Sequence, residues 1–134
     1  MRVRCGAAVA LTAAGLLTFG CNGIVDPSKN TTETFSGTLT PQGFVPHFFS
    51  VTKNGEISAK ITALAPLNNV PVGLIWAQAS ASGACNGAVL QSAVANLNLP
   101  AISGAIFQGN YCVLVYDLGI LTAPETYTVA VSHP

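Results

Sequence analysis

The stretch EISAKIT, residues 56–62, alternates strictly between polar and apolar side chains. Ile57, Ala59 and Ile61 share one parity, and the residues between them are charged or carry hydroxyl groups. Successive side chains of a β-strand point to opposite faces of a sheet, so this stretch predicts an antiparallel strand with one buried face and one solvated face. The same period of two recurs in TYTVAVS, residues 126–132.

Further strands are expected on both sides of this stretch. The predicted strands cover residues 34–40, 47–52, 56–62, 72–78, 101–107, 111–116 and 126–132. Residues 88–99 stay open between a short helix and a strand with an irregular connection, and we favour the strand. Asn54-Gly55 lies between two alternating runs and predicts a β-hairpin. Seven to eight short strands separated by Gly, Pro and Asn turns predict an antiparallel, jelly-roll-like β-sandwich over residues 33–134.

The first 20 residues have the features of an export signal. Arg2 and Arg4 form a basic start, and the uncharged stretch that follows is too short to cross a bilayer core about 30 Å thick. The end of this segment resembles the lipobox of bacterial lipoproteins, which implies a lipid on Cys21 and attachment to a bacterial membrane of the cell envelope. Thr18 stands where that pattern has Leu, so a periplasmic or secreted protein is the alternative. Residues 21–32 are polar and are expected to form a tether.

The four cysteines fit this interpretation. Cys5 leaves with the signal, Cys21 takes the lipid, and Cys85 and Cys112 remain as an even pair in an oxidising compartment. Such a pair predicts one disulfide, with two buried free thiols as the alternative. A zinc site is disfavoured, because neither cysteine has a second cysteine at ligand spacing.

The charge pattern excludes several partners. Downstream of Cys21 there is no arginine, and the net charge is 3 − 5, or −2, from the residues Lys29, Lys53, Lys60, Asp26, Glu33, Glu56, Asp117 and Glu125. Nucleic-acid binding requires clustered Lys or Arg to neutralise phosphates, so it is not expected. Electrostatic binding to anionic lipid is excluded for the same reason.

Few residues suggest catalysis. His47 is interpreted as a structural or edge histidine, His133 as a frayed penultimate residue, and no serine lies in a GxSxG elbow. Asp117 and Glu125 bracket one loop and are weak candidates for a cation site, with solvated turn residues as the simpler interpretation. We therefore predict no enzyme activity, no metal and no cofactor.

Four segments in order resemble the bacterial pre-peptidase C-terminal domain and related small β-sandwiches of exported proteins: TFSGTLTPQG, HFFSVTKNGEISAKIT, GNYCVLVYDLG and TYTVAVSHP. The matching positions are Phe49, Val51, Gly55, Gly109, Tyr111, Tyr127, Thr128 and Val129. The resemblance implies a sandwich or jelly-roll fold and an accessory or binding role. Some relatives bind calcium, carbohydrate or collagen, but the sequence has no calcium-ligand cluster to carry over.

The aromatic residues bear most directly on binding. Trp76 is expected in the core, with an outward sugar-stacking platform as the alternative, and Phe44, Phe48 and Phe107 lie off the inward parity or near turns. An exposed patch of these residues would indicate a partner surface. The function predicted first is a non-enzymatic, membrane-anchored domain with a binding or structural role and an unidentified protein or glycan partner. A carbohydrate-binding module is the alternative, and a small hydrolase is the remote one.

Overall fold

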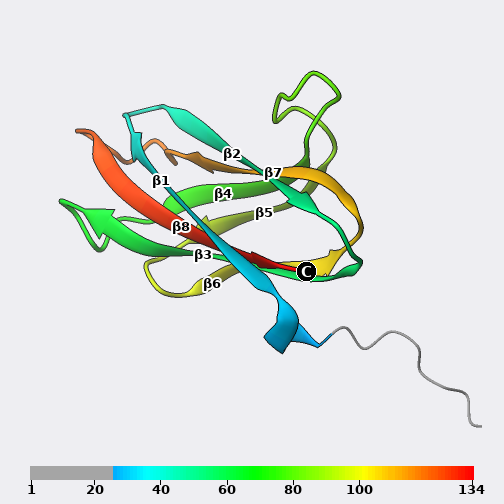
Figure 1. The fold of residues 1–134 in the computed structure, drawn as a ribbon. Coiled ribbons are helices and arrows are strands. Elements are labelled where there is room, and N and C mark those ends of the chain that lie inside the picture. Colours follow the sequence, from blue (N-terminus) through cyan, green and yellow to red (C-terminus); the bar gives the residue numbers. More distant parts are fainter. Residues whose placement is uncertain (1–25) are drawn as a thin grey trace, which may run out of the picture.

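The computed structural model describes residues 26–134, so the predicted signal, Thr18 and Cys21 lie outside the described residues. This part of the chain consists of a short 3-10 turn, Pro27–Lys29, and eight strands (Figure 1). The strands are β1 (Thr31–Leu39), β2 (Phe44–Val51), β3 (Gly55–Ala65), β4 (Val72–Gln78), β5 (Val89–Ala95), β6 (Pro100–Ile106), β7 (Gly109–Tyr116) and β8 (Glu125–His133). Residues 26–134 contain no α-helix, and hence no helix able to cross a membrane.

The strands form two four-stranded antiparallel sheets that pack face to face. Sheet A has the order β1-β8-β3-β6, and sheet B has the order β2-β7-β4-β5. The first strand thus pairs with the last, the second with the seventh, the third with the sixth and the fourth with the fifth. This nested pairing is the arrangement of a jelly roll, so the predicted fold class is confirmed.

The predicted hairpin at Asn54-Gly55 is wrong. β2 lies in sheet B and β3 lies in sheet A, so the connection between them crosses from one sheet to the other. Neither residue has the positive φ that a type I′ turn requires, and Asn54 Oδ1 instead accepts a hydrogen bond of 2.9 Å from Gln108 N. In this topology the only consecutive strands that pair with each other are β4 and β5.

The strand boundaries follow the sequence pattern closely. β4 covers residues 72–78 as predicted, and residues 89–95 form a strand rather than a helix. β1 begins at Thr31, because Thr31 and Thr32 pair with the end of β8, so the last part of the expected tether belongs to the sandwich.

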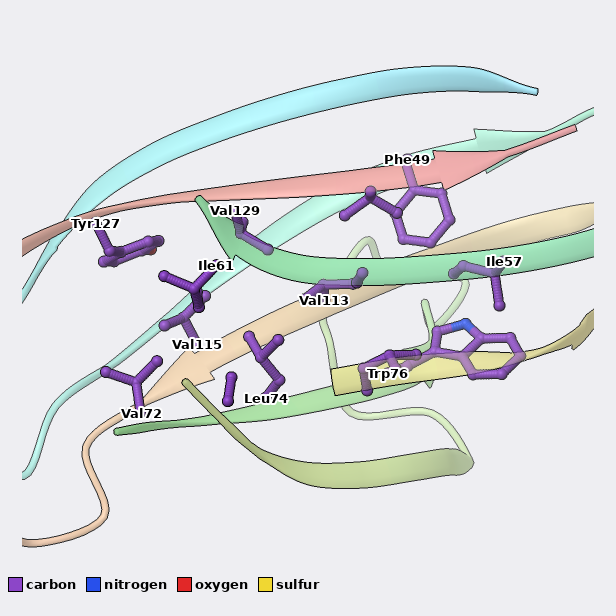
Figure 2. Packing of buried hydrophobic residues seen from close by; sticks show 14 of the residues in the cluster. Phe49, Ile57, Ile61, Val72, Leu74, Trp76, Val113, Val115, Tyr127 and Val129 are labelled. Atoms are coloured by element: carbon purple, nitrogen blue, oxygen red, sulfur yellow. The ribbon is translucent and has the colours of Figure 1, made fainter. Parts of the chain in front are cut away.

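The core lies between the two sheets and is built by the inward parity of nearly every strand. Ile57, Ala59 and Ile61 face it from β3, as the alternation predicted, and meet Leu74 and Trp76 of β4 (Figure 2). The buried hydrophobic residues that form this core are Leu39, Phe49, Val51, Ile57, Ala59, Ile61, Leu64, Val72, Leu74, Trp76, Ala95, Ile102, Ile106, Tyr111, Val113, Val115, Leu121, Tyr127, Val129 and Val131. One continuous core therefore holds both sheets together.

Candidate binding surface

The outer face of sheet B is apolar. The pairing of β2, β7, β4 and β5 places their outward residues in three rows that cross all four strands, and a polar pair on β2 and β7, Ser50 and Asn110, lies beyond the third row. The rows are Phe44, Tyr116, Gly73 and Val94; then Pro46, Leu114, Ile75 and Ser92; then Phe48, Cys112, Ala77 and Val89. We call these three rows the apolar face. None of its residues is charged, and Ser92 and the hydroxyl of Tyr116 are its only polar side-chain groups.

Several side chains on the apolar face are open to solvent. Phe44 is 68% exposed, Val94 is 58% exposed and Phe48 is 43% exposed, whereas Ile75 and Leu114 in the middle row are half-buried. Single exposed apolar residues are ordinary on a protein surface, but a contiguous patch usually marks an interaction site. This contiguity makes the apolar face the candidate binding surface.

Tyr116 lies flat on the apolar face because its cross-strand neighbour is a glycine. A Cβ atom added at Gly73 would lie 2.2 Å from the Tyr116 ring. Any larger residue at this position would lift the ring away from the sheet. Gly73 thus allows Tyr116 to fill the space between Phe44 and Val94 in the first row.

The third row of the apolar face ends at a disulfide-held loop. Residues 79–88 connect β4 to β5 as a projecting loop (Figure 1). Cys85 in this loop is bonded to Cys112 on β7, as the sequence predicted. Cys112 and its partner Ala77 are buried although they point outward. The loop is ordered internally, because Ser80 N donates to Ala84 O at 2.9 Å and Gly83 N donates to Ser80 O at 2.9 Å. It therefore forms a fixed projection beside Phe48.

The outer face of sheet A has the opposite chemistry. One row across all four strands consists of Thr32, Ser132, Ser58 and Ser103. A second cross-strand pair, Ser36 and Thr128, shares a hydrogen bond of 3.0 Å between the hydroxyl groups. Antiparallel sheets often have one solvated face, and sheet A has one. The outer face of sheet B is also open to solvent, but its three rows are apolar.

Asp117, a weak candidate for a cation site, caps a turn. Its Oδ2 atom accepts from Gln42 N at 2.8 Å, and its Oδ1 atom accepts from Ile120 N and Leu121 N at 3.0 and 3.1 Å. The hydrogen bond from Gln42 is the main reason that the pKa of Asp117 lies below its ordinary value. Both carboxylate oxygens are thus committed to the backbone at one edge of the apolar face.

Glu125, the second weak candidate for a cation site, is buried, and its Oε1 atom accepts a hydrogen bond of 2.8 Å from Leu67 N. The described residues contain no group of three His, Cys, Asp or Glu side chains that could hold a metal ion. Asp117 and Glu125 are therefore accounted for by backbone contacts, and the cation site that they suggested gains no support.

His47 lies between the sheets at the edge of the core. Its Nε2 atom is 2.6 Å from the hydroxyl oxygen of Tyr127, and its ring stacks on Phe35 at a centroid distance of 5.1 Å. Burial lowers the pKa of His47 and raises the pKa of Tyr127 to about 12. Both groups are thus neutral at pH 7, and no carboxylate shares a hydrogen bond with His47 as a hydrolase would need. His47 is thus held within the sandwich by Tyr127 and Phe35.

The prediction that His133 frays is wrong. It is the last residue of β8 and only 4% exposed, with its Nε2 atom 2.8 Å from Glu33 Oε1 and its ring stacked on Phe49 at 5.1 Å. The pairing of Thr31 with His133 holds it in the sheet. The penultimate position of His133 did not imply fraying, because the last strand is central in sheet A.

Trp76 does not serve as a ligand platform. It is 5% exposed and points into the core, where it packs at a tilt against Tyr111. Phe48, the other weak ligand-binding candidate, lies on the apolar face. Phe107 is exposed in the connection between β6 and β7, outside the three rows. The sequence therefore identified two members of the surface, Phe44 and Phe48, and missed Tyr116, Ile75 and Val94.

Replacing Tyr127 by Phe is expected to flatten the alkaline end of the stability profile. Unfolded tyrosine ionises near pH 10, whereas folded Tyr127 keeps its proton to about pH 12, so the wild-type free energy of unfolding falls as the pH rises between these values. On the acid side, unfolded His47 gains a proton near pH 6.5 before the folded form does, so stability falls as the pH drops below 6.5. Urea unfolding at a series of pH values measures both effects. If the free energies of unfolding of the wild type and of Tyr127→Phe fell in parallel from pH 10 to 12, the assignment of the alkaline loss of stability to Tyr127 would be contradicted.

Comparisons with known proteins give information about the fold alone. No protein-family model and no curated protein matches the chain. The crystal structure of the Yersinia pseudotuberculosis-derived mitogen is similar, with a TM-score of 0.56, 14% identity and coverage of 78% of this chain and 87% of that one. Aeromonas hydrophila PliG, a periplasmic lysozyme inhibitor of g-type lysozyme, has a TM-score of 0.55, 14% identity and coverage of 81% and 91%. At such identities the likeness establishes a shared β-fold and assigns no residue a role.

Proposed function

We propose that this chain is an exported, lipid-anchored, non-enzymatic domain of the cell envelope that binds a protein partner through its apolar face. The observation that carries the proposal is the contrast between the outer faces of sheets A and B. A soluble sheet needs only its inner face to be apolar, and sheet A follows that rule with hydroxyl groups outside. Sheet B departs from it over three rows, and burying that surface against a partner would be favourable by about 25 cal/mol per Å².

A protein partner fits this face better than a glycan. Sugar recognition combines stacking on aromatic rings with hydrogen bonds to the sugar hydroxyls, which are costly to bury unpaired. Phe44, Tyr116 and Phe48 supply rings on sheet B, but their row neighbours Gly73, Val94, Ala77 and Val89 offer no hydrogen-bonding side chain, and the nearby Ser50 and Asn110 side chains bond to each other at 2.8 Å. Sheet A supplies hydroxyl groups, but its aromatic residues Phe35 and Tyr127 point inward. The carbohydrate-binding alternative is therefore less well supported, and the absence of basic residues from the apolar face speaks against anionic lipid.

Three features support export. The sequence begins with a basic, apolar, small-residue pattern, and the Cys85–Cys112 disulfide is of the kind that persists in oxidising compartments. The similar Aeromonas hydrophila protein is periplasmic and an inhibitor, which is consistent with an exported domain that acts by binding.

Replacing Cys21 by Ser is expected to release the protein from membranes or to block its processing. A diacylated cysteine provides two chains, and each buried CH₂ group contributes about 0.8 kcal/mol, so attachment by two chains is stable. Fractionation of cells that express each form, with mass spectrometry of the mature N-terminus, measures the effect. Equal solubility of both forms without an acyl mass would show a periplasmic or secreted protein instead.

A photoreactive benzoylphenylalanine in place of Phe44 is expected to form covalent adducts in the envelope of living cells. Phe44 is the most exposed aromatic residue of the apolar face, and the new side chain keeps its ring. Thr34, an exposed outward residue on the edge strand β1 of sheet A, is the matched control position and should form few adducts. Equal yields at the two positions, or none at either, would refute the apolar face as the binding surface.

A further inference from the structure

We infer that the partner of the apolar face is a second copy of this chain, packed sheet B against sheet B in a symmetric dimer. This inference rests on the proposed function, because it assigns an occupant to the same surface. Four observations lead to it: the neutrality of the face, its area, the loop that projects at one end, and the proline in one edge strand of sheet B.

The neutrality of the face favours self-association. Residues 26–134 carry a net charge of 3 − 5, or −2, but all of their charged residues lie off the three rows. Two copies can therefore meet without placing like charges in contact. A partner selected by electrostatic complementarity would find nothing on this face to recognise.

The area suits a weak dimer. Three rows about 6.8 Å apart on four strands about 4.8 Å apart give about 400 Å² of flat area per copy, or about 800 Å² for a pair. The accessible area is larger, because the side chains stand above this plane. The total lies below the about 1,200 Å² that stable interfaces bury and within the range of weak, transient ones. Copies held in one membrane would meet at a raised effective concentration, which such an interface needs.

The shape of the face selects one symmetry. A two-fold axis that runs across the strands through the middle row places the Phe44 row of one copy over the Phe48 row of the other. The projecting loop of residues 79–88 then passes the far end of the facing sheet instead of meeting its counterpart. Each copy presents the same patch to the other, as a closed two-fold interface requires. In this arrangement Phe44 meets Phe48 of the partner subunit.

One of the two edges of sheet B disfavours a dimer made by strand addition, whereas the opposite edge strand, β5, contains no proline. Pro46 lies in the middle of the edge strand β2 and has no N–H group to donate to an added strand. Continuation of the sheet through β2 is therefore interrupted, whereas packing through the face is not.

The test uses the full chain expressed in two forms that carry different peptide tags, each with the photoreactive residue in place of Phe44. Irradiation of cells is expected to give an adduct of twice the chain mass that carries both tags, with the cross-link mapped near the partner's Phe48. An adduct that carries one tag and a foreign protein would overturn the dimer and leave the proposed binding face intact. No adduct at all would overturn both.

Two charged variants provide a second measurement that does not depend on the cross-linker geometry. Val94→Asp places a carboxylate at an exposed site on the edge strand β5, where folding is not at stake, and Thr34→Asp places one at an exposed site on sheet A. Val94→Asp is expected to lower the yield of the doubly tagged adduct at least tenfold, and Thr34→Asp to leave it unchanged. Equal yields from the two variants would overturn the proposed interface.

Discussion

Trp76→Ala is expected to lower the free energy of unfolding by about 3–5 kcal/mol, the range for large aromatic residues truncated in a packed core. Trp76 is buried between the sheets, where Tyr111 and Gly104 lie against its ring, and the surrounding strands cannot collapse into the space that it would leave. The loss would be a large fraction of a total stability that is commonly about 5–15 kcal/mol. Equilibrium unfolding in urea measures it.

Two control variants separate burial from polarity. Trp76→Phe keeps an aromatic ring and removes the indole N–H, which has no hydrogen-bond partner in the structure, so its loss should be well below that of the alanine variant. Phe44→Ala removes an exposed ring from the apolar face and is expected to change the stability of the monomer by about 0.5 kcal/mol or less. A loss from Phe44→Ala that equals the loss from Trp76→Ala would contradict the assignment of inward and outward faces.

Removal of the disulfide by Cys85→Ala with Cys112→Ala is expected to lower the free energy of unfolding by about 3.5 kcal/mol. The bond closes a loop with a sequence separation of 27, and the loss of that constraint frees the unfolded chain. The wild-type protein under reducing conditions should approach the stability of the double variant, since both lack the same cross-link. If the double variant were as stable as the oxidised protein, closure of the loop by the disulfide would contribute nothing to the free energy of unfolding.

The same double variant has a second expected effect. Residues 79–88 would lose the bond that fixes them beside Phe48 and would move relative to the apolar face. Fewer adducts from the Phe44 position in this variant would indicate that the loop helps to shape the binding surface.

The strands could be predicted because their burial is one-sided. Residues 56–62 and 126–132 alternate in sequence because sheet A has a solvated hydroxyl face, and both stretches form strands as expected. β4 was predicted correctly at residues 72–78, and its continuous apolar run belongs to a central strand between β7 and β5. Its outward residue Ile75 lies on an open face, so the run is apolar on both parities without being covered on both sides.

The topology and the binding surface required more than local patterns. Asn54-Gly55 has the composition of a hairpin turn, but turn composition does not reveal whether the next strand pairs with the preceding one or crosses to the other sheet. Tyr116 and Val94 belong to one row only because β7, β4 and β5 pair in a particular register. That register depends on contacts between distant segments, which the alternation within one strand does not encode.

The edge position of β1 determines how the domain would respond to tension. The chain enters sheet A at Thr31, and β1 is held along its length by β8 alone, with Thr31 opposite His133 and Leu39 opposite Glu125. A pull on the N-terminal side, against a domain held at its opposite end, acts along the strand and loads all the hydrogen bonds between β1 and β8 at once. A domain anchored through its N-terminus would therefore resist extraction in shear, rather than peel open one bond at a time.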